Sequence, residues 1–156
     1  MKENSHSTIY HNNGVALNGY DVVAYFTEGK AKIGQSIYSA TWQELIWQFS
    51  SQENLNTFRS NPQEFLPQYG GYCAFGISND YKALPDLEAF TIHEGKLYLN
   101  FADYVKKRWF EKVTEKVSLA DQKWTTTMSS VPIKANRTLI YVKYKLLLLF
   151  GKDLFN

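Results

Sequence analysis

The feature that most constrains the fold is a β-hairpin in the second half of the chain. Two runs of alternating apolar and polar residues, 89–93 (AFTIH) and 96–100 (KLYLN), flank the dipeptide Glu94-Gly95. A two-residue connection that ends in glycine is typical of the tight turns that join antiparallel strands. The sequence therefore predicts strands over 89–93 and 96–100, paired antiparallel.

A second hairpin is predicted earlier in the chain. Residues 37–42 (IYSATW) and 45–49 (LIWQF) are rich in β-branched and aromatic side chains, and only Gln43 and Glu44 separate them. Such runs favour pleated, half-buried strands. We expect these two runs to pair in the same antiparallel way.

Helices are predicted around both hairpins. Asp21 is placed to cap a short helix over 22–27, and Ser50 with Glu53 has the spacing of a capping box. Apolar residues at helical spacing predict a long helix over 102–117, which restarts at Ser118 and runs to Trp124. The predicted fold class is therefore α+β, with two antiparallel β-hairpins packed against helices in the order α-β-β-α-loop-β-β-α.

Charge divides the chain unevenly, although its net value is only +2. Residues 126–156 contain five basic residues and one acidic residue, a net charge of +4. Residues 1–125 contain twelve basic and fourteen acidic residues, a net charge of −2. A nucleic-acid-binding domain is expected to have a basic body. We therefore expect no nucleic-acid partner.

The length of 156 residues suits one domain with extensions. We expect a flexible N-terminus over 1–13, a domain over 14–124 and a basic, apolar C-terminal extension over 125–156. No run of about 18 apolar residues is present, so no transmembrane segment is expected. Residues 139–150 are apolar but include two lysines, and contact with a membrane surface is an alternative left open for them. The polar N-terminus lacks the apolar run of a secretory signal, which predicts either a cytoplasmic protein or a mature form whose signal was removed.

The segment 69–76 (YGGYCAFG) contains the only cysteine, Cys73, directly after two adjacent glycines and a tyrosine. A thiolate can bind copper or zinc or act as a nucleophile. His93 and Asp21 are the residues that folding would have to bring near Cys73 to form a metal site. For each of the three a structural role is the alternative: packing for Cys73, helix capping for Asp21 and a surface position for His93.

Three segments together resemble the YHS domain family, in its branch of small, mostly uncharacterised bacterial proteins that are often exported. They are 17–26 (LNGYDVVAYF), 68–74 (QYGGYCA) and the spaced residues Tyr38, Trp47, Gln48, Phe49, Ser50, Ser51, Phe58, Asn61, Pro62 and Phe65. The resemblance covers residues 15–124. Other branches of this family occur in copper-transporting ATPases and metal-handling proteins, where a cysteine often stands at the position that Ser50 occupies in this chain.

The resemblance implies a small, non-catalytic module, and we expect it to bind a transition metal, copper or zinc, through Cys73. Two alternatives stay open. One is a module that binds a protein or a small ligand without metal, and the other is a thiol-dependent redox protein that uses Cys73. No phosphate-binding glycine loop, serine-hydrolase motif or paired-cysteine zinc motif is present in the sequence.

Overall fold

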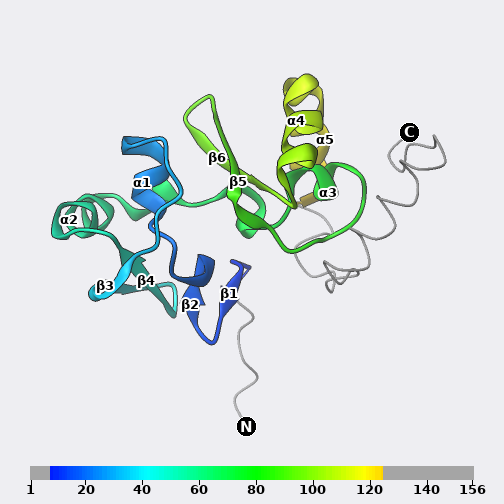
Figure 1. Cartoon of the computed structure of the whole chain (residues 1–156). Helices are drawn as coiled ribbons and strands as arrows, with labels where there is room; N and C mark the ends of the chain where they lie inside the picture. Colours follow the sequence, from blue (N-terminus) through cyan, green and yellow to red (C-terminus); the bar gives the residue numbers. More distant parts are fainter. Residues whose placement is uncertain (1–7, 125–156) are drawn as a thin grey trace, which may run out of the picture.

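Two β-sheets and five α-helices make up residues 8–124, the part of the chain that the computed structural model describes (Figure 1). The α+β class and both predicted hairpins are confirmed. The strands are β1 (His11–Asn12), β2 (Val15–Ala16), β3 (Gln35–Trp42), β4 (Leu45–Phe49), β5 (Asp86–His93) and β6 (Lys96–Asn100). The helices are α1 (Val22–Thr27), α2 (Gln52–Ser60), α3 (Ala74–Ser78), α4 (Asp103–Glu111) and α5 (Val113–Lys123).

The larger sheet has the strand order β1-β2-β4-β3, so β3 forms one edge. β3 and β4 pair antiparallel across a turn in which Gln43 and Glu44 both have positive φ, 48° and 62°. β2 lies parallel to β4, with Val15 opposite Ile46. Helix α2 packs against β3 and β4, and α1 packs against α2. This sheet and its two helices form one half of the molecule.

Strand β6 lies between two hydrophobic cores. Leu97 and Leu99 pack in a first core with the larger sheet and α1, whereas Tyr98 packs in a second core with α3, α4 and α5. Alternate side chains of a strand point to opposite faces, which explains why neighbouring residues of β6 enter different cores. Figure 1 shows the β5–β6 hairpin between the two groups of elements. The high aromatic content serves mainly these cores, which contain Trp47, Trp109, Tyr25, Tyr98, Phe49 and Phe58 among their fully buried side chains.

Helix α2 begins one residue later than the capping box predicts. Its N-cap is Ser51, whose hydroxyl accepts a hydrogen bond from the backbone N–H of Asn54 at 3.1 Å. Ser50 does not cap this helix, because its backbone N–H and its hydroxyl both bind the carboxylate of Asp21. The predicted cap was therefore wrong by one residue.

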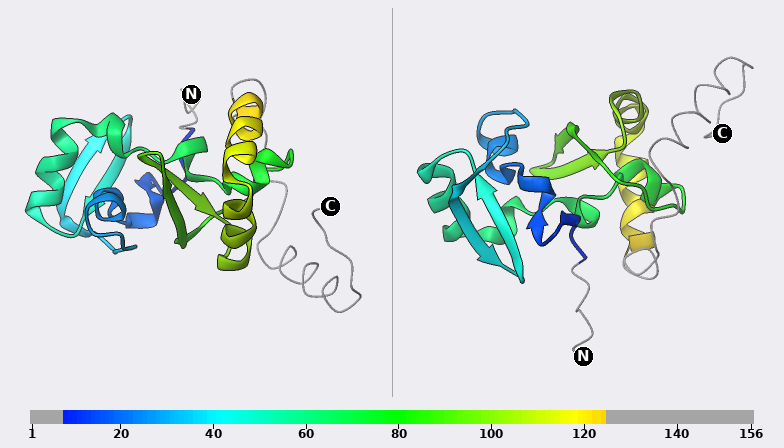
Figure 2. Two further views of the ribbon diagram at one scale, coloured as in Figure 1. Left: turned by 90° about the horizontal axis from the view of Figure 1, so that it is seen from above. Right: turned by 60° about the horizontal axis from the view of Figure 1, so that its bottom comes forward.

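The last predicted helix is divided at Lys112, which has φ −135° and ψ 43°. We had expected a continuous helix over 102–117 with a break at Ser118. Trp109 of α4 and Ala120 of α5 are both buried in the second core, and the bend lies between them. Figure 2 shows the two helices following one another along one side of the β5–β6 hairpin.

Two other boundaries differ from the sequence expectation. Residues 8–13, which the sequence assigns to the N-terminal extension, include β1, and the backbone N–H of Tyr10 donates to the carbonyl of Gly70 at 2.7 Å. The segment predicted as a loop between the two halves contains α3, which begins directly after Cys73. Both features depend on contacts between distant parts of the chain, which local patterns do not record.

Within residues 8–124, none of the helices has the length and apolar character needed to cross a membrane. The predicted C-terminal extension over 125–156, including the apolar residues 139–150, lies outside the described part of the chain.

Candidate functional site

Asp21 is fully buried and is the N-cap of α1. Its Oδ1 accepts hydrogen bonds from the backbone N–H groups of Val23 and Ala24, at 2.9 and 3.2 Å. Its Oδ2 accepts from the backbone N–H and the hydroxyl of Ser50, at 2.7 and 2.6 Å, and from the side-chain amide of Asn54 at 2.7 Å. A carboxylate has about four lone-pair sites, so these five donors occupy its full capacity to accept hydrogen bonds. The arrangement supports a structural role that joins α1 to the start of α2.

Cys73 is also fully buried, at the N-terminus of α3. Its thiol donates to Oδ1 of Asn100 at 3.7 Å, and its Sγ accepts from the backbone N–H of Gly76 at 3.4 Å. Burial raises the pKa of the thiol to about 11, although backbone hydrogen bonds from Gly76, Phe101 and Phe75 act in the opposite direction. A thiol with this pKa is protonated at neutral pH. Nucleophilic attack requires the thiolate, which is therefore scarce at neutral pH.

The two glycines before Cys73 allow a close approach of the N-terminal segment. Gly70 has φ +63°, and a Cβ atom at this position would overlap with the carbonyl oxygen of Thr8. Gly71 has φ +83°, and a Cβ there would meet the side chain of Leu17 at 2.8 Å. The glycine pair therefore serves packing against the N-terminal segment and against Leu17 of the first core, and it does not form an open cradle for a ligand.

His93 ends β5 beside the tight turn, opposite Lys96. Its ring lies 6.5 Å from that of Tyr98, and its Nε2 lies 4.0 Å from a carboxylate oxygen of Glu94. No group of three or more histidine, cysteine, aspartate or glutamate residues in 8–124 is arranged to hold a metal ion. Cys73, His93 and Asp21 are thus not brought together as a ligand set, and metal binding through Cys73 stays a prediction.

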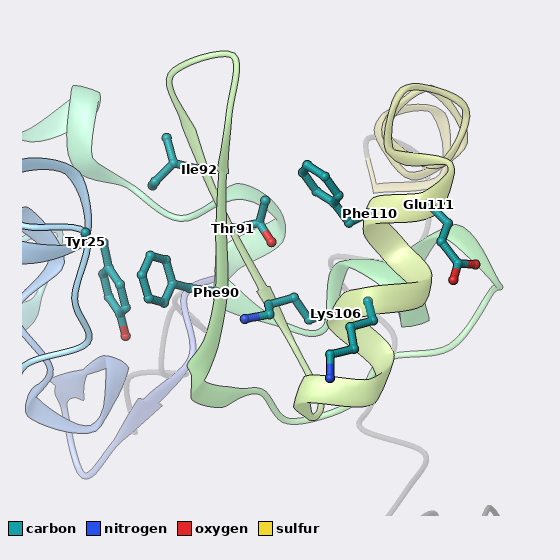
Figure 3. Close-up of a pocket in the computed structure, with 9 residues that line it drawn as sticks. Tyr25, Phe90, Thr91, Ile92, Lys106, Phe110 and Glu111 are labelled. Carbon is teal, nitrogen blue, oxygen red and sulfur yellow. The ribbon is translucent and has the colours of Figure 1, made fainter.

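A cavity of about 690 Å³ lies between β5, α4 and the end of α1, and we call it the β5–α4 cavity. Figure 3 shows that its side chains come from these separate elements. Its lining residues are Tyr25, Gly29, Phe90, Thr91, Ile92, Lys106, Lys107, Phe110 and Glu111. A smaller cavity of about 360 Å³ lies between residues 62–68 and the β5–β6 turn.

The wall of the β5–α4 cavity is mainly apolar and partly open to solvent. The ring of Phe90 packs against that of the buried Tyr25, with centroids 4.8 Å apart and an angle of 56° between the ring planes. Ile92 and Phe110, which both line the cavity, remain 37% and 59% exposed. Phe110 does not belong to the apolar stripe of α4. An aromatic residue at such a position is the one sequence signal that indicates a large side chain outside the core. Sequence reasoning missed the cavity because β5 and α4 meet only in the folded chain.

The charged rim of this cavity comes from α4. The ammonium groups of Lys106 and Lys107 lie 3.2 and 3.0 Å from the two carboxylate oxygens of Asp103. These contacts lower the pKa of Asp103, the hydrogen bond from Lys107 most strongly. The cavity thus combines an apolar wall with two cations on one edge.

Comparison with protein-family models, with curated proteins and with solved structures finds no match for this chain. Membership of the YHS domain family stays a prediction that rests on the three sequence segments. The geometry of the described residues is therefore the basis for a functional proposal.

Proposed function

We propose that this chain is a non-catalytic module that binds a small, largely apolar ligand in the β5–α4 cavity. The observation that carries the proposal is the pair of exposed side chains, Ile92 and Phe110, that face a hollow of about 690 Å³. Pockets for small molecules commonly enclose about 300–1,000 Å³ and are lined mainly by apolar and aromatic groups. A ligand in this cavity would remove both side chains from water, which is favourable by roughly 25 cal/mol per Å² of apolar surface.

The rigid surroundings of the cavity support a binding role. Tyr25 is fully buried, and its hydroxyl donates to the carbonyl of Leu87 at 2.6 Å, which fixes the ring under Phe90. A preorganised wall reduces the conformational entropy that binding costs. The wall on the β5 side therefore needs no rearrangement to receive a ligand.

The chemistry of the lining favours binding over catalysis. Burial raises the pKa of Tyr25 far above its usual range, so this hydroxyl neither gives nor takes a proton at neutral pH. The cavity's lysines pair with Asp103, and its other titratable side chain is Glu111. Acyl and group transfer require a general base within reach of a nucleophile. The residues that line this cavity do not form such an arrangement.

The proposal takes up the metal-free alternative of the sequence analysis. The full burial of Cys73, the fully hydrogen-bonded Asp21 and the absence of a group of metal ligands within residues 8–124 give metal binding less support than the cavity gives ligand binding.

Binding of N-phenyl-1-naphthylamine, an apolar dye that fluoresces when it leaves water, tests the proposal. We expect saturable fluorescence with the full-length protein, and a dissociation constant raised about tenfold or more by Phe110→Ser or Ile92→Ser. Ile37→Ser is the matched control, because Ile37 lies on β3, is 76% exposed and does not line the cavity. Equal loss of binding in all three variants, or no saturable binding by wild type, would overturn the proposal.

A further inference from the structure

Two lysine side chains converge on one carboxylate at the edge of the β5–α4 cavity. Lys106 and Lys107 each contact a different oxygen of Asp103, at 3.2 and 3.0 Å. Both lysines line the cavity, whereas Asp103 does not. The structure therefore displays two ammonium groups already arranged around a planar carboxylate beside an apolar wall.

The two cations differ in their exposure. The side chain of Lys106 is 31% exposed, while that of Lys107 is 73% exposed. In Figure 3, Lys106 extends from α4 toward Phe90 on β5, so its methylene groups add to the wall and its ammonium group lies on the cavity side. Lysine commonly buries its stem along apolar surface in this manner and keeps its charge accessible.

The ion pairs with Asp103 are exchangeable. Asp103 is 62% exposed, and exposed pairs of this kind contribute about 0–1 kcal/mol because water screens them. The carboxylate of a ligand in the cavity would bind the same two ammonium groups. The carboxylate of Asp103 would then be hydrated instead. Glu111 is the acidic residue of the lining, and Figure 3 shows its carboxylate directed away from Phe90 and Ile92.

We propose that the ligand of the β5–α4 cavity is an apolar carboxylate whose charged end binds Lys106 and Lys107 in place of Asp103. This inference rests on the proposed function and adds the chemical class of the ligand. The apolar part lies against Phe90, Ile92 and Phe110, and the carboxylate lies at the α4 edge. The recognition elements are thus one apolar wall and one pair of cations.

Three probes with the same twelve-carbon chain and different ends test this assignment. Dodecanoate, 1-dodecanol and dodecyltrimethylammonium are titrated into the full-length protein below their aggregation concentrations, with displacement of N-phenyl-1-naphthylamine as the readout. We expect dodecanoate to bind about tenfold more tightly than 1-dodecanol, and the ammonium probe to bind most weakly. This preference should decrease as salt is added, because the cations are partly exposed.

Variants assign the preference to individual residues. Lys106→Gln combined with Lys107→Gln should abolish the preference for dodecanoate, so that the double variant binds dodecanoate and 1-dodecanol with equal affinity. Asp103→Asn should tighten dodecanoate binding several-fold, because the competing carboxylate is removed. Lys32→Gln is the matched control: Lys32 forms an exposed ion pair with Glu28 at 2.9 Å outside the cavity, and its loss should change neither affinity.

The outcomes separate the two proposals. Binding of all three probes with equal affinity would leave the proposed function standing and would overturn the carboxylate assignment. Tighter binding of the ammonium probe would also overturn the assignment, since it would mean that carboxylates near the cavity, and not the two lysines, contact the charged end of the ligand. Absence of binding by every probe and by the dye would overturn both proposals.

Discussion

The carboxylate of Asp21 receives two hydrogen bonds from Ser50, one from the backbone N–H at 2.7 Å and one from the hydroxyl at 2.6 Å. Because these residues are 29 positions apart, the pair joins the start of α1 to the end of β4. The hydroxyl of Ser50 therefore serves the fold by fixing the buried carboxylate of Asp21.

Replacement of Asp21 tests this structural role. Asp21→Ala leaves the donors of Ser50 and Asn54 without their buried acceptor, and a lost buried charged hydrogen-bonding group commonly costs several kcal/mol. We expect the free energy of unfolding, measured by urea denaturation, to fall by about 3 kcal/mol or more. Glu28→Ala removes an exposed ion pair and should cost less than about 1 kcal/mol. Similar losses for the two variants would contradict the role assigned to Asp21.

The close approach at Gly70 makes a second prediction about stability. In Gly70→Ala, the new Cβ atom would overlap with the Thr8 carbonyl oxygen in a left-handed backbone conformation. We expect a loss of about 3 kcal/mol or more in the free energy of unfolding. Gly95→Ala separates the two causes, because Gly95 has φ +70° with open space around it and should lose only about 1–2 kcal/mol. A Gly70 variant no less stable than the Gly95 variant would refute the contact.

Burial of Cys73 predicts a contribution to the pH dependence of stability. The thiol has a pKa of about 11 in the folded chain and 9.0 as its ordinary value, so the unfolded chain loses this proton first as the pH rises. The contribution is therefore complete below pH 9 and is lost between pH 9 and pH 11, with a size on the order of 2–3 kcal/mol. Urea denaturation from pH 8 to pH 11 should show a steeper fall for wild type than for Cys73→Ala. Parallel curves would show that the buried thiol is not the titrating group.

Metal content tests the remaining hypothesis about Cys73. Cys73 is fully buried, and no group of metal ligands forms among residues 8–124, so we expect Cys73→Ser to have the same copper and zinc content as wild type, both purified without metal-affinity resin. Elemental analysis gives this comparison directly, with circular dichroism as the check that the variant is folded. Near-stoichiometric metal in wild type that is lost in Cys73→Ser would instead make Cys73 a ligand and favour a metal-binding module.

Local sequence patterns predicted those features of the fold that depend on neighbouring residues. The Glu94-Gly95 turn joins antiparallel strands, with both residues at positive φ, and Asp21 caps the helix that begins at Val22. Turn geometry and helix capping are decided within a few residues, so the sequence records them. The choice between Ser50 and Ser51 as the cap of α2 depended on Asp21, which lies far away in the sequence, and the prediction was wrong there.

The candidate site depends on tertiary contacts to a greater extent. Ile92 belongs to a predicted strand and Phe110 to a predicted helix, but no local pattern indicates that they face one cavity. Cys73 drew attention because it is the only cysteine, whereas its burial and its bond to Asn100 follow from how β6 and α3 pack. The sequence therefore indicated the elements that carry the site, and the folded chain was needed to locate the site itself.

Mapping of the binding site by two-dimensional ¹H–¹⁵N spectra of the full-length protein tests the central claim most directly. On titration with N-phenyl-1-naphthylamine, the account predicts saturable shifts concentrated at residues 90–92, 106, 107, 110 and 111, which line the β5–α4 cavity. Ile37 and Ile46, exposed apolar residues of the larger sheet, should not shift. Shifts centred on the larger sheet, or none that saturate, would contradict the account.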